Sequence, residues 1–155
     1  MADLEIRDIP YRLKEGITFA ERGYLERAFP IFSGYLEAYP DSALALSYTG
    51  MIRTVKDGEV QQGLQMCQEA VQRDPKEALV HLNLSRVHFH MGDRFQAVRA
   101  LQKGLKIRSP YRECLMGFQV TMGRRRNPPI SFLKRNNPIN ELLGKITWKL
   151  KGGRH

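Results

Sequence analysis

The feature that most constrains the fold of this chain is a set of five marks that recurs three times, at intervals of 34 and 35 residues. Each set holds a glycine, a small residue five positions later, an apolar residue, a further mostly small residue and a closing proline. A period of this length is typical of helical units that stack side by side. In chain order the marks are Gly23, Gly58 and Gly92; Ala28, Gly63 and Ala97; Phe32, Cys67 and Leu101; Tyr35, Ala70 and Gly104; and Pro40, Pro75 and Pro110.

Each mark has a physical role in a helix–turn–helix unit. The glycine ends the first helix in a left-handed conformation at no steric cost. The small residues let the second helix pack closely on the first. The proline is expected at the first position of the next helix, as at Pro75, where Asp74 would cap the helix and Glu77 would favour its positive end. With apolar periodicity, the pattern predicts an all-α chain with helices near 11–22, 25–38, 42–55, 59–72, 76–90 and 94–107.

On these residues the chain resembles the tetratricopeptide repeat family. The first repeat matches through Gly16, Phe19, Gly23, Ala28, Phe32 and Pro40, and the third through Leu84, Ser85, His88, Gly92, Ala97, Leu101 and Gly104. The second has Arg53 at an aromatic position and one extra residue before Gly58. Pro30 also departs from the pattern, and should kink the second helix or delay its start. The resemblance implies an α-α superhelix, a short solenoid of three antiparallel helix pairs with repeats at 9–42, 43–77 and 78–110.

The resemblance also implies a protein-interaction module, an adaptor or scaffold, and no enzymatic activity. In the family, the first helix of each pair lines a concave groove. The matching positions are mainly apolar: Leu13, Ile17, Ser47, Met51, Thr54, Leu82, Asn83, Arg86 and His90. Some relatives clamp a C-terminal carboxylate with lysines and asparagines. Only Asn83 fits that pattern, so we expect no binding of chaperone tails through such a clamp.

The C-terminal part of the chain carries most of the net charge of +9. Residues 111–122 are expected to form a capping helix, 123–137 a linker rich in Pro, Arg and Asn, and 138–151 a basic amphipathic helix. Its cations are Arg124, Arg125, Arg126, Lys134, Arg135, Lys145, Lys149 and Lys151. Three interpretations stay open: the tail packs on the repeats, docks on a protein partner, or binds nucleic acid or an anionic membrane through charge. No known nucleic-acid-binding motif is present.

Other classes of function find no support in the sequence. The three clustered histidines, His81, His88 and His90, have no companion Cys or carboxylate at metal-ligand spacing. No catalytic or phosphate-binding motif occurs, so we expect neither metal nor cofactor. The chain has no transmembrane run and no secretory signal, which suggests a cytoplasmic protein. A small secretion-type chaperone is an alternative, although such chaperones tend to be acidic. Self-association into a homodimer also stays open, because three repeats are near the minimum for stability.

Overall fold

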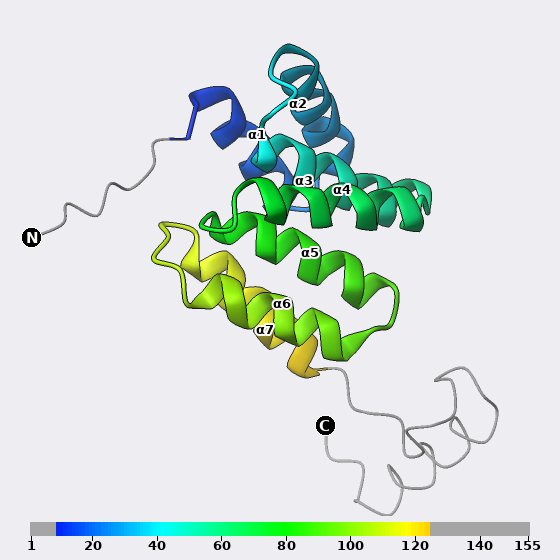
Figure 1. Cartoon of the computed structure of the whole chain (residues 1–155), viewed down its shortest axis with the longest axis vertical. Helices are drawn as coiled ribbons and strands as arrows, with labels where there is room; N and C mark the ends of the chain where they lie inside the picture. The colour runs from blue at the N-terminus through cyan, green and yellow to red at the C-terminus, as the bar shows by residue number, and fades with distance from the viewer. Residues whose placement is uncertain (1–8, 125–155) are drawn as a thin grey trace, which may run out of the picture. The chain divides into compact units, whose positions relative to one another are not determined.

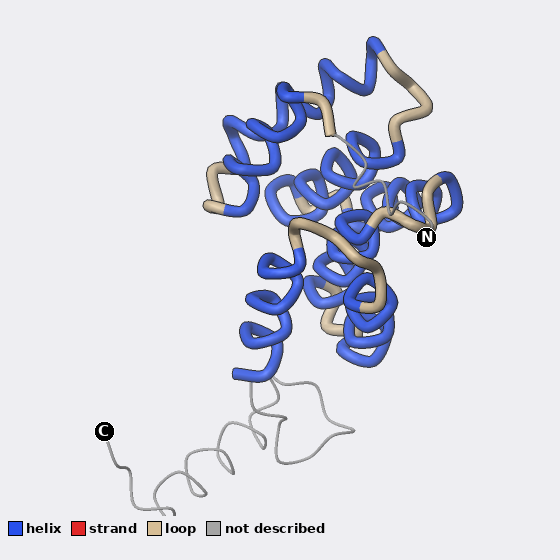
Figure 2. Tube along the Cα trace, turned by 90° about the vertical axis from the view of Figure 1, so that its left-hand side faces the viewer, coloured by secondary structure: helices blue, strands red, loops and turns tan. Residues whose placement is uncertain are grey.

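In the computed structural model, which describes residues 9–124, every regular element is a helix (Figures 1 and 2). This confirms the predicted all-α class. Residues 9–120 belong to one unit, and residue 121 begins a second. The elements are α1 (Tyr11–Glu21), α2 (Leu25–Ala38), α3 (Ala43–Ile52), the π-helix η1 (Arg53–Asp57), α4 (Val60–Arg73), α5 (Ala78–His90), α6 (Arg94–Leu105) and α7 (Arg112–Arg124).

Three glycines turn the chain between the helices of each pair. Gly23, Gly58 and Gly92 have φ angles of 83°, 73° and 83°, and no other residue type in the described part has a positive φ. A side chain at these positions would clash with its own backbone, which is why glycine recurs there. The predicted role of the three glycines is confirmed: α1 packs with α2, α3 with α4 and α5 with α6.

The repeated prolines lie in turns, and the expectation that each begins a helix is wrong. The N–H of Ser42 donates to the carbonyl of Tyr39 (3.1 Å), and that of Glu77 donates to the carbonyl of Asp74 (3.3 Å). Proline is therefore the second residue of a four-residue turn, a position that suits its fixed φ.

The residue that closes each of these two turns caps the next helix. The Ser42 hydroxyl accepts the N–H of Ala45 (3.3 Å), and the Glu77 carboxylate accepts that of Leu79 (3.1 Å). Asp74, the expected cap, accepts the N–H of Lys76 inside the turn instead (3.3 Å). The proline thus sets the approach to the helix, while the residue two positions later satisfies its free N–H groups.

The extra residue of the second repeat is absorbed by the π-helix η1. Gly50 and Gly58 are eight positions apart, whereas Gly16 and Gly23 are seven apart. A π-helix has one residue more per hydrogen-bonded turn than an α-helix, so it lengthens the segment without breaking it. The Thr54 hydroxyl donates to the carbonyl of Gly50 (3.0 Å) at this point.

Pro30 does not delay the second helix, because α2 begins at Leu25 and runs through it. Proline has no N–H to donate to the carbonyl of Glu26 four residues earlier. Both residues are exposed, so water can satisfy that carbonyl.

The core lies around α3, whose ten residues are all buried. This helix packs against α2, α4 and α5. The rings of Phe32 and Tyr48 stack with centroids 4.3 Å apart and planes 3° from parallel. A helix that is covered on all sides has no amphipathic stripe, and its position inside the unit explains why. Among residues 9–124, no helix is both long and apolar enough to cross a bilayer.

Candidate protein-interaction face

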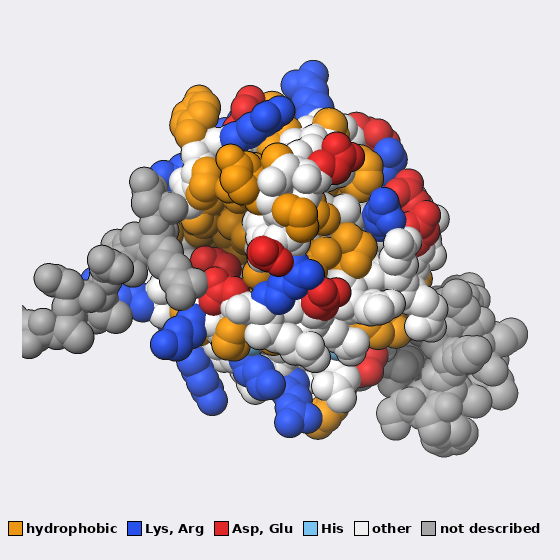
Figure 3. Space-filling model, turned by 45° about the horizontal axis from the view of Figure 1, so that its top comes forward, with side chains coloured by type: hydrophobic (Ala, Val, Ile, Leu, Met, Phe, Trp, Pro, Cys, Tyr) orange, Lys and Arg blue, Asp and Glu red, His pale blue; other side chains and the backbone are white. Residues whose placement is uncertain are grey.

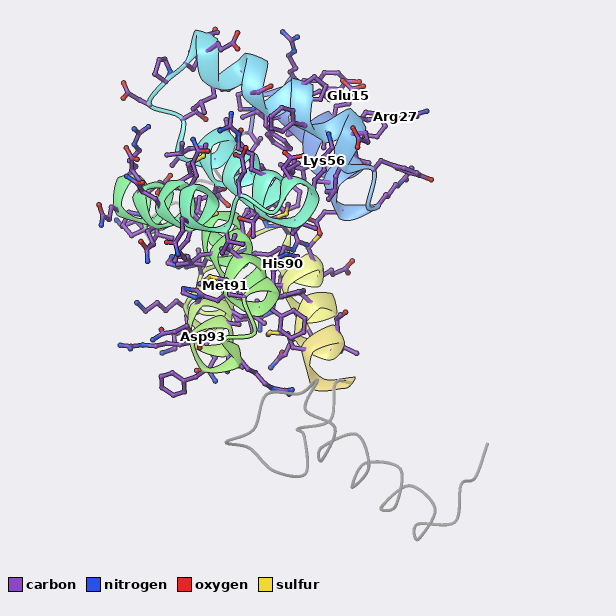
Figure 4. All side chains as sticks on the ribbon, turned by 90° about the vertical axis from the view of Figure 1, so that its right-hand side faces the viewer. Glu15, Arg27, Lys56, His90, Met91 and Asp93 are labelled. Carbon is purple, nitrogen blue, oxygen red and sulfur yellow. The ribbon has the colours of Figure 1, made fainter. Side chains whose placement is uncertain are left out.

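The residues predicted to line a groove are mostly inside the unit. Seven of the nine have at most 3% of their surface exposed: Leu13, Ile17, Ser47, Met51, Thr54, Leu82 and Asn83. The Arg86 side chain is 17% exposed, and His90 is exposed. Figure 4 shows His90 and Met91 at the end of α5, apart from the labelled Glu15 on α1. A partner that meets the folded unit would therefore touch Arg86 and His90 from this set.

Arg86 on α5 forms a two-pronged ion pair with Glu21 on α1. Its Nη2 lies 2.6 Å from Oε2 of Glu21, and its Nη1 lies 2.8 Å from Oε1. Only 17% and 18% of the two side chains are exposed. Burial acts to lower the pKa of Arg86, but the hydrogen bonds and charge of Glu21 outweigh it and raise that pKa overall. The fork geometry matches guanidinium to carboxylate.

Further hydrogen bonds extend this pair into an interhelix network made of Glu21, Ser47, Tyr48, Asn83 and Arg86. The Tyr48 hydroxyl donates to Glu21 (3.1 Å), and Arg86 donates to Oδ1 of Asn83 (3.3 Å). Nδ2 of Asn83 donates to Oγ of Ser47 (3.0 Å). Burial, and then the charge of Glu21, raise the pKa of Tyr48 well above its ordinary value. The network links the first helices of all three pairs.

Helix α7 also contacts Arg86. The Phe118 ring lies 5.6 Å from the guanidinium carbon of Arg86, within the range of a cation–π contact. The same ring meets Phe89 edge-on, with centroids 5.6 Å apart. Burial and the charge of Glu21 raise the pKa of Cys114, one turn earlier on α7. The seventh helix thus contributes to the same face as α1 and α5.

Sequence reasoning missed Glu21 and Tyr48, although Glu21 carried a usable signal. It lies in the last turn of α1, where the helix dipole disfavours a carboxylate. A residue placed against a local rule often has a partner elsewhere in the fold. The identity of that partner, 65 residues further along the chain, has no local signal.

The polar groups of this face bond to one another and form no reactive arrangement. The Ser47 hydroxyl donates to the carbonyl of Leu44 (2.9 Å) and accepts from Asn83, so it faces no base. The Cys67 thiol is fully buried, donates to the carbonyl of Ser47 (3.3 Å) and has its pKa raised to about 12 by burial. Within residues 9–124, no group of three His, Cys, Asp or Glu residues could hold a metal ion.

Residues 55–110 match the family model of the tetratricopeptide repeat. This part of the chain is therefore similar to the tetratricopeptide repeat family. The match spans α4, α5 and α6, and the α1–α2 pair outside it has the same left-handed turn glycine. Tetratricopeptide repeats generally mediate protein–protein interaction, and the family is typically non-catalytic. No curated protein matches this chain.

The predicted basic tail lies almost entirely outside the described residues. Of its eight cations, Arg124 is the last residue of α7. The other seven are Arg125, Arg126, Lys134, Arg135, Lys145, Lys149 and Lys151. The expected linker at 123–137, beyond its first two residues, and the expected helix at 138–151 also lie outside that part.

Proposed function

We propose that this tetratricopeptide repeat chain is a non-catalytic adaptor or scaffold that binds a peptide or helix of a protein partner. The observation that carries the proposal is the interhelix network. In this network the polar groups of the predicted binding face are hydrogen-bonded to one another, so no free nucleophile or base remains there. A surface without reactive groups, on repeats that generally bind proteins, is suited to contact and not to chemistry.

The partner is proposed to bind along an edge at the end of α5 (the α5 edge), which comprises the exposed His90 and Met91 and the partly buried Arg86. Arg86 and His90 are four positions apart and so lie on one side of the helix. Met91 is 41% exposed and adds apolar surface at the end of the edge. Figure 3 shows another feature suited to protein contact, a face where acidic, basic and hydrophobic side chains lie together.

Site-specific photo-crosslinking in the full-length chain tests this proposal. A crosslinker at His90 should capture one defined protein, and the same crosslinker at Glu15, which is exposed on α1, should not (Figure 4). The double variant His90→Ala with Met91→Ala should weaken binding of the captured protein. Equal capture from both positions, or unchanged affinity of the variant, would contradict binding at the α5 edge.

A second candidate function rests on the charge of the C-terminal part. Residues 117–155 hold nine Lys and Arg residues and only Glu141 as an acid. Such a segment favours association with nucleic acid or an anionic membrane, with an affinity that falls steeply as salt rises. Changing Arg124, Arg125 and Arg126 to Gln should reduce retention on DNA or on phosphatidylserine vesicles. Unchanged retention, or retention that is independent of salt, would remove this candidate. The same charge disfavours the secretion-chaperone alternative.

A further inference from the structure

A pocket of about 280 Å³ opens between α4, α5 and α6, away from the α5 edge. Its polar lining consists of His81 and His88 from α5 and of Gln96, Arg99 and Lys103 from α6, and three apolar side chains complete the wall. No Asp or Glu lines it. The two full cations, Arg99 and Lys103, make this pocket a candidate site for an anion.

The two cations of the pocket are not neutralised. Arg99 and Lys103 are exposed and four positions apart, so they project from the same side of α6. Neither forms an ion pair within residues 9–124, whereas Arg86 and Arg73 each pair with a glutamate at 2.6 Å. Like charges at this spacing destabilise a helix slightly. An anion held between them would turn that repulsion into attraction.

The two imidazoles each have a ring nitrogen without a partner. His81 is 4% exposed, and its Nε2 donates to the carbonyl of Pro75 at 2.9 Å. That bond places the proton of the neutral ring on Nε2, so Nδ1 of His81 carries a free lone pair. Nδ1 of His88 is likewise buried and has no hydrogen-bond partner. Buried polar atoms in folded proteins nearly always have a partner, so the hydrogen bonding of these two side chains in the pocket wall is incomplete.

We propose that this pocket binds a phosphate group. A guanidinium and an ammonium on adjacent turns can donate several charge-assisted hydrogen bonds to a tetrahedral oxyanion. The amide of Gln96 adds a neutral donor. The volume lies at the lower end of the range for ligand pockets, so it suits a phosphate group with a small attachment. This site is independent of the proposed protein-binding edge.

An NMR titration of the isotope-labelled full-length chain tests the proposal, with inorganic phosphate and O-phosphoserine as the two probes. At constant ionic strength, we expect saturable shifts at His81, His88 and Gln96. The double variant Arg99→Gln with Lys103→Gln should weaken binding by about tenfold or more. The double variant Arg12→Gln with Arg22→Gln removes the same charge from exposed positions outside the pocket and should bind as the unchanged chain does.

The two probes also distinguish the source of the phosphate. Tighter binding of O-phosphoserine than of inorganic phosphate would indicate that the pocket binds a phosphorylated protein. Equal binding of the two probes would indicate that it binds free phosphate. Shifts that do not saturate, that chloride reproduces, or that the Arg12 and Arg22 control loses to the same extent would overturn the proposal. Circular dichroism checks that both double variants fold. If one of them does not fold, the NMR shifts of the unchanged chain still test whether the pocket binds phosphate.

Discussion

At the scale of single residues, Arg86 is a mostly buried charge that depends on several partners. It is held between the carboxylate of Glu21 and the ring of Phe118, and it also donates to Asn83. A charge that is mostly removed from water is tolerated only when its partners are in place. Removing one member of such a pair leaves the other uncompensated, which costs more than the pair itself contributes.

Arg86→Ala should therefore destabilise the fold. Breaking a fully buried pair costs about 3–5 kcal/mol, and the remaining exposure of this pair reduces our expectation to about 2–3 kcal/mol. Arg53→Ala is the control, because Arg53 pairs with Glu59 at 3.6 Å near the surface, where such pairs contribute about 0.2–1 kcal/mol. Urea unfolding followed by circular dichroism measures both. Equal losses in the two variants would show that the Glu21 pair is no better than a surface pair.

The buried thiol of Cys67 should make the free energy of unfolding vary with pH in the alkaline range. Burial raises the pKa of its thiol from 9.0 to about 12, so the folded chain favours the protonated form. That contribution is complete below pH 9.0 and is lost as the pH rises toward about 12. The raised pKa of Tyr48 acts in the same direction.

The free energy of unfolding should consequently fall as the pH rises above 9.0, the ordinary thiol value. Cys67→Ala should make this fall shallower without abolishing it, since Tyr48 still titrates. The variant will also be less stable at neutral pH because it leaves a small cavity. Urea unfolding at a series of pH values separates the two effects. An identical pH slope in both proteins would mean that the buried thiol contributes nothing to it.

At the scale of elements, the α3–η1 segment and α4 approach each other closely. A Cβ atom on Gly63 would overlap the Thr54 hydroxyl and the carbonyl of Gly50. A Cβ atom on Gly50 would lie 2.8 Å from the carbonyl oxygen of Gly63. The two backbones thus touch where the chain changes from α-helix to π-helix. Small residues at both positions allow the inserted residue and the close helix pair to coexist.

Gly63→Ala should destabilise the fold by about 1–3 kcal/mol, since overpacking forces the backbone apart. Gly34→Ala is a matched control within another helix, because a Cβ atom there meets nothing within 4 Å. That control should stabilise the fold by about 0.5–1 kcal/mol through helix propensity. Thermal and urea unfolding give the sign of each change. A neutral or stabilising Gly63→Ala would mean that α4 can shift freely against η1.

At the scale of the whole described unit, the interhelix network connects repeats that are not neighbours. In a linear repeat protein each repeat contacts only the adjacent ones, and unfolding can proceed piece by piece. Here Glu21 in the first helix pair bonds to Arg86 in the third, across 65 residues of chain. Tyr48 of the second pair joins the same carboxylate. Loss of any one pair therefore disturbs the other two.

Hydrogen exchange should reflect this arrangement. We expect the amides of α3 to exchange slowest, and only through global unfolding, because all ten of its residues are buried. Phe118→Ala removes contacts to Arg86 and Phe89 and should speed exchange in α7 more than in α3. Exposed Phe95→Ala serves as the control. Faster exchange in α3 than in α1, or an equal effect of both substitutions, would contradict this order.

The sequence by itself determined the helical class, the approximate helix positions and the three turns. These features depend on neighbouring residues: Gly23, Gly58 and Gly92 need no distant contact to adopt a positive φ. The π-helix also had a local sequence signal, which is the extra residue before Gly58. The predicted helix caps were wrong because proline suits the second position of a four-residue turn as well as the first position of a helix. The sequence pattern is the same in both cases.

Only the tertiary structure decided which surface remains open. Leu13, Met51 and Leu82 were placed on the correct helices, but periodicity cannot tell a groove from an interface that another element covers. Burial depends on what packs against a face, and here the partners come from distant parts of the chain. The same reason accounts for the pairing of Glu21 with Arg86 and for the pocket beside His81. Each exists because folding brings together side chains that no local pattern connects.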